Sequence, residues 1–334
     1  RRIGSIIVAI GYDMFDPRHM MEYGYGSHPD ILTSMEFERL INSAGPTGGE
    51  IIKPSNGKHP KKILFVLCVG SRDRRHYRYC SRFCCMYSIK HAYQALDHGV
   101  DDITVLYMDM RAYGKGFDGF WSRTQEEGAR FVRGRPARIK PNMNGTISVL
   151  YENLSQGKRV SEDYDMVVLA NAVTPSEDLV DLAECLGLGL DEDGFIRCEE
   201  IHGGLITTTR PGIYTAGCVS GPKDIPDSVA EGSGAASLAI SHLTEKYWPE
   251  QPEIELIEDV KIPRIGVFVC HCGSNIAGVI DVEEVVEYSR HIPGVVFASN
   301  QMFSCAGNTQ KEIEDAIKNE KINRVVVAAL SLIH

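Results

Sequence analysis

Four cysteines crowded into eighteen residues are the most chemically distinctive feature of the sequence. They lie at a C-x11-C-x3-C-C spacing after the apolar run Ile63 to Leu67, and they are Cys68, Cys80, Cys84 and Cys85. Four thiolates without matching histidines suit zinc or an iron–sulfur cluster. Zinc prefers C-x2-C or C-x4-C pairs, so the vicinal pair favours a cluster, whose irons sit at separate corners. Inert thiols or a disulfide are the alternatives.

Three more cysteines follow two apolar runs near residue 300. Cys270 and Cys272 come directly after Ile265 to Val269, and Cys305 follows the run Val295 to Ala298. If both runs are parallel strands, their carboxyl ends share one edge of a sheet. These three thiols could then face one site. A clusterless structural domain is the alternative.

The first thiol group requires a strand, a turn and a helix to position it. Lys62 to Leu67 is predicted as a buried strand, and a helix from near Ser81 to about Asp97 would place Cys80 and Cys84 one turn apart. Gly99 ends that helix, and Ile103 to Met108 is the next strand. This βαβ order predicts a parallel sheet with a right-handed crossover.

A G-x-G-x-x-G sequence occurs at Gly114 to Gly119, before a predicted helix from Phe120 to Glu127. It follows the second strand of this domain, whereas a nucleotide-binding fold carries the motif after the first, where Cys68 stands here. A glycine-rich turn is therefore favoured over a pyridine-nucleotide site. Alternating strands between Ala137 and Asn171, with Thr146 to Tyr151 and Tyr164 to Ala170 the clearest, predict a small antiparallel meander.

Another candidate site begins at a short buried strand, Ile213 to Ala216. Gly217 ends the strand, and a helix rich in small residues is predicted from about Asp227 to Leu243. A strand end facing a helix amino terminus can bind a phosphate or a polarised ring oxygen. A plain strand–turn–helix packing element is the alternative.

The composition limits the class of protein. A length of 334 residues suggests two or three domains, and 43% hydrophobic with 24% charged residues is typical of a globular protein. A net charge of -10 disfavours nucleic acid or an anionic membrane as partner. We expect no membrane span and no secretory leader, and ten cysteines then indicate metal or redox work in the cytoplasm.

Three stretches carry a resemblance to a known family. CVGSRD, YCSRFCCMYSIKHA and GIYTAGCVSGPKDIPDSVAEGSGAAS closely resemble the A subunit of heterodisulfide reductase, which is the flavin and iron–sulfur subunit of anaerobic electron-transfer complexes in methanogenesis. The resemblance implies FAD, one [4Fe-4S] cluster at the first four cysteines, and a second cluster at Cys270, Cys272 and Cys305. The family has a further cysteine after the third strand of the latter domain, where Leu330 stands here.

The resemblance also implies a fold and a domain plan. We expect an α/β protein with a partial two-dinucleotide-binding-domain fold, like thioredoxin or glutathione reductase, followed by a small Rossmann-like βαβαβ domain. The expected parts are residues 1–58 and 173–245 for the FAD-binding domain, 59–172 for an NAD-domain-like module with the cluster, 246–263 for a linker, and 264–334 for the small domain. That small domain opens the usual family member, and the first half of the flavin domain is missing, so the chain is expected to be a split, fused or rearranged form.

Two residues are expected to act at the flavin. A capping box from Thr33 starts a helix to Asn42 that carries Glu36 and Glu38. By resemblance, Glu38 lies near the flavin and Lys90 near its reactive nitrogen, whereas a solvated surface is the alternative for both. Lys90 lies five residues beyond Cys85, about 7.5 Å along a helix. The resemblance assigns flavin contacts to Gly11, Gly217, Cys218, Pro222, Lys223, Asp224, Ile225, Asp227 and Ser228.

The expected function follows from these parts. The family implies an oxidoreductase that supports FAD-based electron bifurcation or confurcation between a two-electron donor, a disulfide-type acceptor and ferredoxin. Its expected partners are heterodisulfide reductase B- and C-like subunits, hydrogenase or formate dehydrogenase subunits, and another chain that completes the FAD site, in a homodimer of heteromers. An NAD(P)H-dependent flavin disulfide oxidoreductase and a non-catalytic scaffold are the alternatives.

Overall fold

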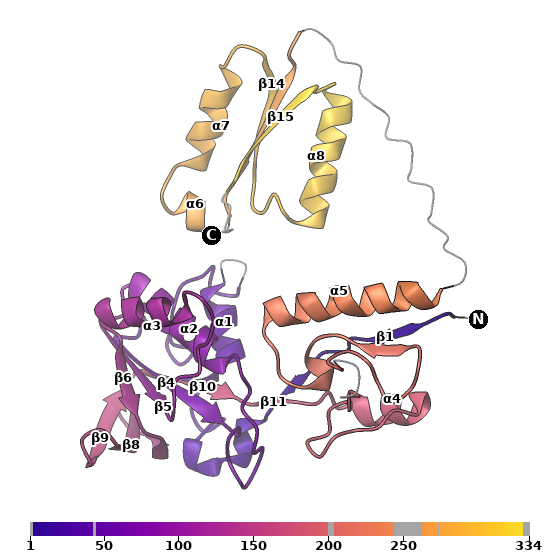
Figure 1. Cartoon of the computed structure of the whole chain (residues 1–334). Coiled ribbons are helices and arrows are strands. Elements are labelled where there is room, and N and C mark those ends of the chain that lie inside the picture. Colours follow the sequence, from indigo (N-terminus) through magenta and orange to yellow (C-terminus); the bar gives the residue numbers. More distant parts are fainter. Residues whose placement is uncertain (1–2, 43–44, 200–203, 244–261, 273, 330–334) are drawn as a thin grey trace. The chain divides into compact units, whose positions relative to one another are not determined.

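A computed structural model describes residues 3–42, 45–199, 204–243, 262–272 and 274–329 (Figure 1). The chain forms two compact units. The first comprises Arg1–Glu38 and Ile52–Trp248, and the second comprises Arg39–Ile51 and Pro249–His334. None of the described helices is both long and apolar enough to cross a membrane.

A five-stranded parallel sheet forms the centre of the first unit. Its order is β3-β10-β4-β5-β6, with bounds Ile31–Thr33, Met166–Asn171, Lys62–Val69, Asp102–Tyr107 and Arg130–Arg133. Every residue of β10, and every residue of β4 after Lys62, is buried. Such continuous apolar runs are typical of parallel strands that are covered on both faces. The structure therefore confirms the α/β class and the parallel β4–β5 pair.

Three helices accompany this sheet: α1 (Ser34–Ile41), α2 (Cys84–Asp97) and α3 (Phe117–Glu126). Helix α2 contacts β4 and β5, and it buries Ile89, Ala92 and Ala95 on one face (Figure 1). The predicted start of this helix near Ser81 was wrong, because Arg82 has a left-handed φ of 65° that a right-handed helix cannot contain. Cys80 consequently lies in the loop rather than on the helix.

A small antiparallel meander packs beside this sheet. Its strands are β7 (Pro136–Pro141), β8 (Ile147–Asn153) and β9 (Lys158–Tyr164). The predicted meander is thus present, but its assignment of Tyr164 to Ala170 was wrong. That stretch is β10, which pairs in parallel with β3 and β4, because an all-apolar run belongs in the middle of a covered sheet.

The remaining part of the first unit is built on a two-stranded parallel sheet, β1 (Ile6–Val8) with β12 (Ile213–Thr215). Helix α5 (Ile225–His242) packs on both strands, and α4 (Leu179–Leu186) contributes Leu179 to their core. The chain enters and leaves the larger sheet through an antiparallel pair, β2 (Asp13–Met14) with β11 (Val173–Thr174). Short 3-10 helices cover Pro17–His19, Met21–Tyr23 and Gly217–Ser220.

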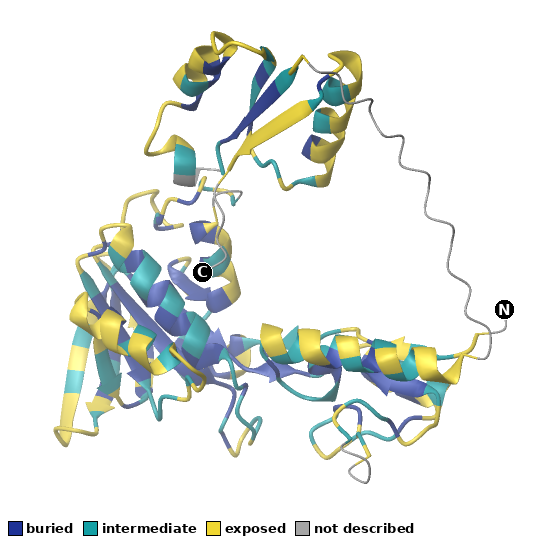
Figure 2. Cartoon of the chain, turned by 45° about the horizontal axis from the view of Figure 1, so that its top comes forward, coloured by how far each residue is buried: buried dark blue, intermediate teal, exposed yellow. Residues whose placement is uncertain are grey.

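The second unit contains the predicted βαβαβ order. Strands β13 (Ile265–Cys270), β14 (Val295–Gln301) and β15 (Arg324–Ala328) form a parallel sheet in the order β14-β13-β15. Helices α6 (Ser274–Ala277), α7 (Val282–Arg290) and α8 (Gly307–Asn319) complete it. The central strand β13 is buried from Gly266 onward, whereas β15 is exposed along its whole length (Figure 2).

Candidate cofactor site

The last residues of β4 carry the first thiol. Cys68 is 2% exposed and has a left-handed φ of 60°, and Gly70 follows with a φ of 82°. The loop then folds back on itself, because the amide of Tyr77 donates to the carbonyl of Gly70 at 3.0 Å and that of Arg72 donates to Tyr79 at 2.9 Å. This return brings the chain from the strand end to the start of α2.

Cys84 contacts two of the other three thiols. Hydrogen bonds from Cys84 lower the pKa of Cys68 to about 7 and also lower the pKa of Cys85. The same two hydrogen bonds, together with burial, raise the pKa of Cys84 well above its ordinary value. Cys68, Cys84 and Cys85 are all buried. The structure therefore gathers these three sulfurs into one buried group.

Cys80 lies in the loop beside that group. Its Sγ accepts a hydrogen bond from the amide of Arg82 at 3.3 Å. The preceding residue, Tyr79, accepts the amide of Arg72 at 2.9 Å, which places Cys80 beside the backbone of that arginine. The donor set is thus four soft sulfurs with arginines around them, which fits an anionic iron–sulfur cluster. Among the described residues, no three His, Cys, Asp or Glu side chains are arranged around a single metal-ion position.

A cavity of about 770 Å³ opens within the first unit beside α2. It lies against aromatic and apolar side chains from β2, α2, α3 and α5, among them Tyr12, Phe83, Tyr87 and Phe120. Of the residues expected at the flavin, seven line it: Glu38, Lys90, Cys218, Lys223, Asp224, Ile225 and Ser228. Segments from four distant parts of the sequence therefore meet at one cavity.

The other four expected flavin residues lie near this cavity without lining it. Gly217 donates its amide to Glu231 at 3.0 Å, and Asp227 pairs with Arg82. Pro222 lies between the 3-10 helix at Gly217 and the start of α5, and Gly11 precedes β2 with a φ of 79°. Their role in cofactor binding stays a prediction.

Glu38 and Lys90 form an ion pair in the wall of the cavity. Nζ of Lys90 lies 2.8 Å from Oε1 and 2.6 Å from Oε2 of Glu38. The expected pair is therefore in direct contact, and its role at a flavin stays a prediction. The capping box explains how Glu38 is presented, since Thr33 donates its amide at 2.7 Å to Glu36 and accepts the amide of Glu36 at 3.3 Å.

His91 is a site residue that sequence reasoning missed. Its ring is 2% exposed, and Nε2 contacts Oε2 of Glu38 while Nδ1 has no hydrogen-bond partner among the described residues. The hydrogen bond from His91, supported by Lys90, lowers the pKa of Glu38 to about 2. Burial lowers the pKa of His91, so the imidazole is neutral and donates from Nε2. The only signal in the sequence was its position next to Lys90.

Arg82 links the thiol loop to the cavity. Its amide donates to Cys80, while its side chain lines the cavity, pairs with Asp227 at the start of α5 and stacks 5.4 Å from the ring centre of Tyr113. No motif pointed to this residue. The structure shows that one residue contacts both expected cofactor sites through different atoms.

A buried ion pair supports the start of α5. Nζ of Lys223 lies 3.5 Å from Oε1 of Glu231 and 2.9 Å from Oγ of Ser220. Burial raises the pKa of Glu231. Asp224 caps the helix by accepting the amide of Asp227 at 3.0 Å. The amino terminus of α5, which begins two residues before its predicted start at Asp227, therefore faces the cavity with a fixed backbone.

The G-x-G-x-x-G stretch is explained by local packing. Helix α3 begins at Phe117 rather than Phe120, inside the motif. Gly114 has a φ of 131°, and a Cβ there would lie 3.1 Å from the Phe117 ring, while Gly116 has a φ of 91°. The glycines thus make a turn and seat an aromatic ring, in line with the glycine-rich turn favoured above.

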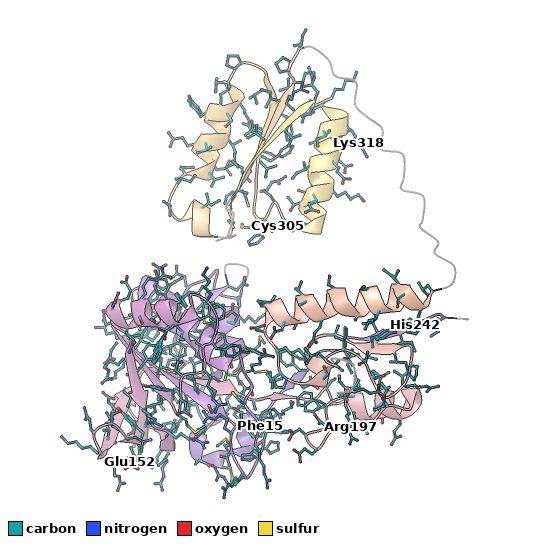
Figure 3. All side chains as sticks on the ribbon, in the orientation of Figure 1. Phe15, Glu152, Arg197, His242, Cys305 and Lys318 are labelled. Atoms are coloured by element: carbon teal, nitrogen blue, oxygen red, sulfur yellow. The ribbon has the colours of Figure 1, made fainter. Side chains whose placement is uncertain are left out.

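The second thiol group lies at the end of β13 in the second unit. The amides of Cys272 and Ser304 donate to Sγ of Cys270 at 3.2 and 3.3 Å. Burial opposes ionisation of Cys270, but these hydrogen bonds prevail and its pKa is lowered. Cys305, next to Ser304, is exposed at the start of α8 (Figure 3). The three thiols therefore share one sheet edge, and Leu330 lies outside the described residues.

Comparison with known proteins identifies relatives over most of the chain. It is 48% identical over 242 residues to the A subunit of the H(2):CoB-CoM heterodisulfide,ferredoxin reductase of Methanothermobacter thermautotrophicus. The matched stretch covers 71% of this chain and 36% of the relative. It is 45% identical over 243 residues to the iron-sulfur A subunit of the CoB--CoM heterodisulfide reductase of Methanocaldococcus jannaschii, with the same coverage. No family model matches the chain.

Solved structures that resemble the chain include two thioredoxin reductases. The enzyme of T. acidophilum matches with a TM-score of 0.47 and 16% identity, and that of Lactococcus lactis with 0.46 and 19%. Each covers 71% of this chain and 65% of the other. The chain spans little more than a third of the length of its curated relatives. Over the stretch that it shares with them, the chain belongs, as a partial form, to the family of heterodisulfide reductase A subunits.

Proposed function

We propose that the chain is the core of an electron-transfer flavo-iron-sulfur subunit, with FAD in the cavity and a [4Fe-4S] cluster at Cys68, Cys80, Cys84 and Cys85. The observation that supports this most is that α2 serves both sites. It begins with Cys84 and Cys85, and one to two turns later it presents Lys90 to the cavity. Two redox cofactors so placed would be neighbours. When bound, FAD exchanges electron pairs and the cluster exchanges single electrons.

The cavity has the chemistry that an isoalloxazine ring needs. Its volume lies within the range of roughly 300–1,000 Å³ that is usual for small-molecule sites, and its aromatic wall suits a flat ring. The amino terminus of α5 offers the positive end of a helix dipole. Lys90 supplies a cation that stabilises negative charge on a reduced flavin.

Glu38 and His91 would control that cation. Glu38 holds Lys90 through both carboxylate oxygens, and His91 fixes the carboxylate from the buried side. A Lys–Glu pair that opens frees the ammonium for the flavin, whereas a closed pair partly neutralises it. The side chains of Lys90 and Glu38 are 41% and 40% exposed, so the pair has room to move.

The proposed partners and overall reaction are inferred from the names of the relatives. These include the A subunit of an H(2)/formate:CoB-CoM heterodisulfide,ferredoxin reductase of Methanococcus maripaludis. For this chain we infer a complex with B- and C-like subunits, a hydrogenase or formate dehydrogenase, and ferredoxin, in which electron bifurcation occurs in the cytoplasm. A second chain would complete the FAD site in a homodimer of heteromers, and Cys270, Cys272 and Cys305 would hold a second cluster.

Cofactor analysis of the anaerobically purified complex tests this proposal. We expect FAD, and about four iron atoms with as many acid-labile sulfides for each loaded site. Zinc in place of iron, or no visible chromophore, would overturn it. Rapid reduction of the bound flavin by NADH, with no cluster present, would instead indicate an NAD(P)H-dependent flavin oxidoreductase.

A further inference from the structure

Arg72 has a guanidinium that is fixed on one side and unsatisfied on the other. Nη2 donates to Oδ2 of Asp109 at 2.6 Å, and the side chain is 19% exposed. Nη1 is buried and has no hydrogen-bond partner among the described residues. The backbone is held as well, by the bond from its amide to Tyr79 and by a left-handed φ of 54°. A buried N–H without an acceptor is costly unless a bound group supplies one.

The thiol group is the environment of this guanidinium. Arg72 follows Cys68 by four residues, and its amide donates to the carbonyl of Tyr79, the residue before Cys80, at 2.9 Å. Nη2 binds Asp109, and the Sγ of Cys85 lies 3.9 Å from the carbonyl oxygen of the same Asp109. The loop and Asp109 therefore place three of the four expected ligands around one cation, which is not itself a ligand.

Two neighbouring arginines differ from Arg72 in this respect. Arg135, whose charge also reaches Cys68, donates to Asp73 at 3.2 Å and to the Tyr23 hydroxyl at 3.4 Å. Arg133 donates to Asp109 and to the carbonyl of Met108, and its side chain is 56% exposed. Neither has a buried nitrogen without a partner among the described residues.

We propose that Nη1 of Arg72 donates a hydrogen bond to a sulfur of the cluster held by Cys68, Cys80, Cys84 and Cys85, and thereby raises the reduction potential of that cluster. Asp109 fixes the other nitrogen, so the donor is oriented before the cluster binds. A donor and a positive charge stabilise the reduced, more negative cluster over the oxidised one. This inference rests on the proposed cluster and adds a positioning residue to it.

The first test is an EPR-monitored redox titration of the anaerobically purified complex. Arg72→Gln should lower the ratio of reduced to oxidised cluster at fixed potential about tenfold, a shift of roughly 59 mV for a one-electron couple. Arg133→Gln is the matched control, because it removes a nearby charge that also binds Asp109 but is exposed. It should shift the ratio far less. Equal shifts in the two variants would overturn the proposal.

A second measurement needs no stable Arg72→Gln protein. Complex labelled with 15N only in the guanidinium groups should show a 15N hyperfine coupling to the reduced cluster in pulsed EPR, and Arg72→Lys should abolish it. A coupling that is missing in the labelled wild type, or that persists in Arg72→Lys, would overturn the proposal. Wild-type complex without iron and sulfide would instead overturn the cluster itself, so the two failures are distinct.

Discussion

The two thiol sites share a design but differ in completeness. In each, a cysteine lies in the last two residues of the central strand of a parallel sheet, Cys68 in β4 and Cys270 in β13. Each site also has a cysteine with a left-handed φ, which is Cys68 in the first and Cys272 in the second. The first site has four thiols within one loop and helix start, three of them buried. The second has three thiols spread over 36 residues, and Cys305 is exposed.

This difference shows how the spacing of the ligands along the chain affects a cofactor site. In the first site, hydrogen bonds within the loop from Gly70 to Tyr79 bring the chain from Cys68 back to the start of α2, so all four thiols come from one continuous segment. In the second, Cys305 is brought to Cys270 only by the pairing of β13 with β14. Its charge environment also differs, because amides rather than arginines surround Cys270. We therefore expect the first site to assemble more robustly.

The largest effect should come from removing one ligand at each site. Cys84→Ala should remove about four iron atoms per chain, because the residue contacts two other thiols, and leave the second site loaded. Cys272→Ala should do the reverse. Iron and sulfide analysis with EPR measures both, and Cys185→Ala, at an exposed thiol, is the control. Full iron content in Cys84→Ala would contradict the assignment.

A charge change in the cavity should affect the first unit alone. Lys90→Met should lower the flavin potential by about 30 mV, equivalent to roughly 1.4 kcal/mol for a two-electron couple, because a cation that favours the reduced flavin is lost. Glu38→Gln should raise the potential, since it frees Lys90. Spectroelectrochemistry measures both variants, and Lys158→Met on the exposed meander is the control. A shift in the second site's cluster would show that the sites are coupled.

Low pH should lower the stability of the first unit against unfolding, because His91 is buried. Burial lowers the pKa of His91 below 6.5 in the folded state. The unfolded state therefore binds more protons than the folded state once the pH drops below 6.5. The free energy of unfolding then falls by up to about 1.4 kcal/mol per pH unit. Glu38, whose pKa is lowered from 4.5 to about 2, adds stability above pH 4.5 that is lost as pH falls toward 2. His91→Gln should flatten the profile just below pH 6.5 and weaken the Glu38 part.

Urea unfolding followed by tryptophan fluorescence can measure this profile, since Trp121 belongs to the first unit. His98→Gln, at the exposed residue that follows the last residue of the same helix, should keep the wild-type slope. An unchanged slope in His91→Gln would show that the imidazole does not control the acid response.

The smallest effects should come from the helix caps. Thr33→Ala breaks the capping box of α1, and Asp281→Ala removes the side chain that accepts the amide of Glu284 at 3.0 Å at the start of α7. Each should cost about 1 kcal/mol of stability in its own unit. Only Thr33→Ala should also weaken flavin binding, because α1 presents Glu38. Equal flavin affinity in both variants would mean that Glu38 does not depend on the cap.

The sequence predicted the strands and the thiols better than it predicted the cavity. The apolar runs at β4, β5 and β13 and the capping box at Thr33 are local patterns, and the structure confirms them. The start of α2 was predicted too early in the chain, because no residue type around Arg82 indicates a left-handed backbone conformation. His91, Arg82 and Glu231 were missed because their roles come from contacts with distant segments, which no local spacing encodes.

The left-handed conformations of the thiol loop have a practical consequence. Cys68, Arg72 and Arg82 each adopt a backbone conformation that costs on the order of 1–3 kcal/mol for a side chain other than glycine. Metal ligation would offset that cost, so the bare loop should relax and open. Five arginines lie between residues 72 and 82, each a point of cleavage for trypsin. Limited digestion should therefore cut the iron-free chain within this loop and spare the loaded one, which makes protease resistance a simple gauge of cofactor occupancy.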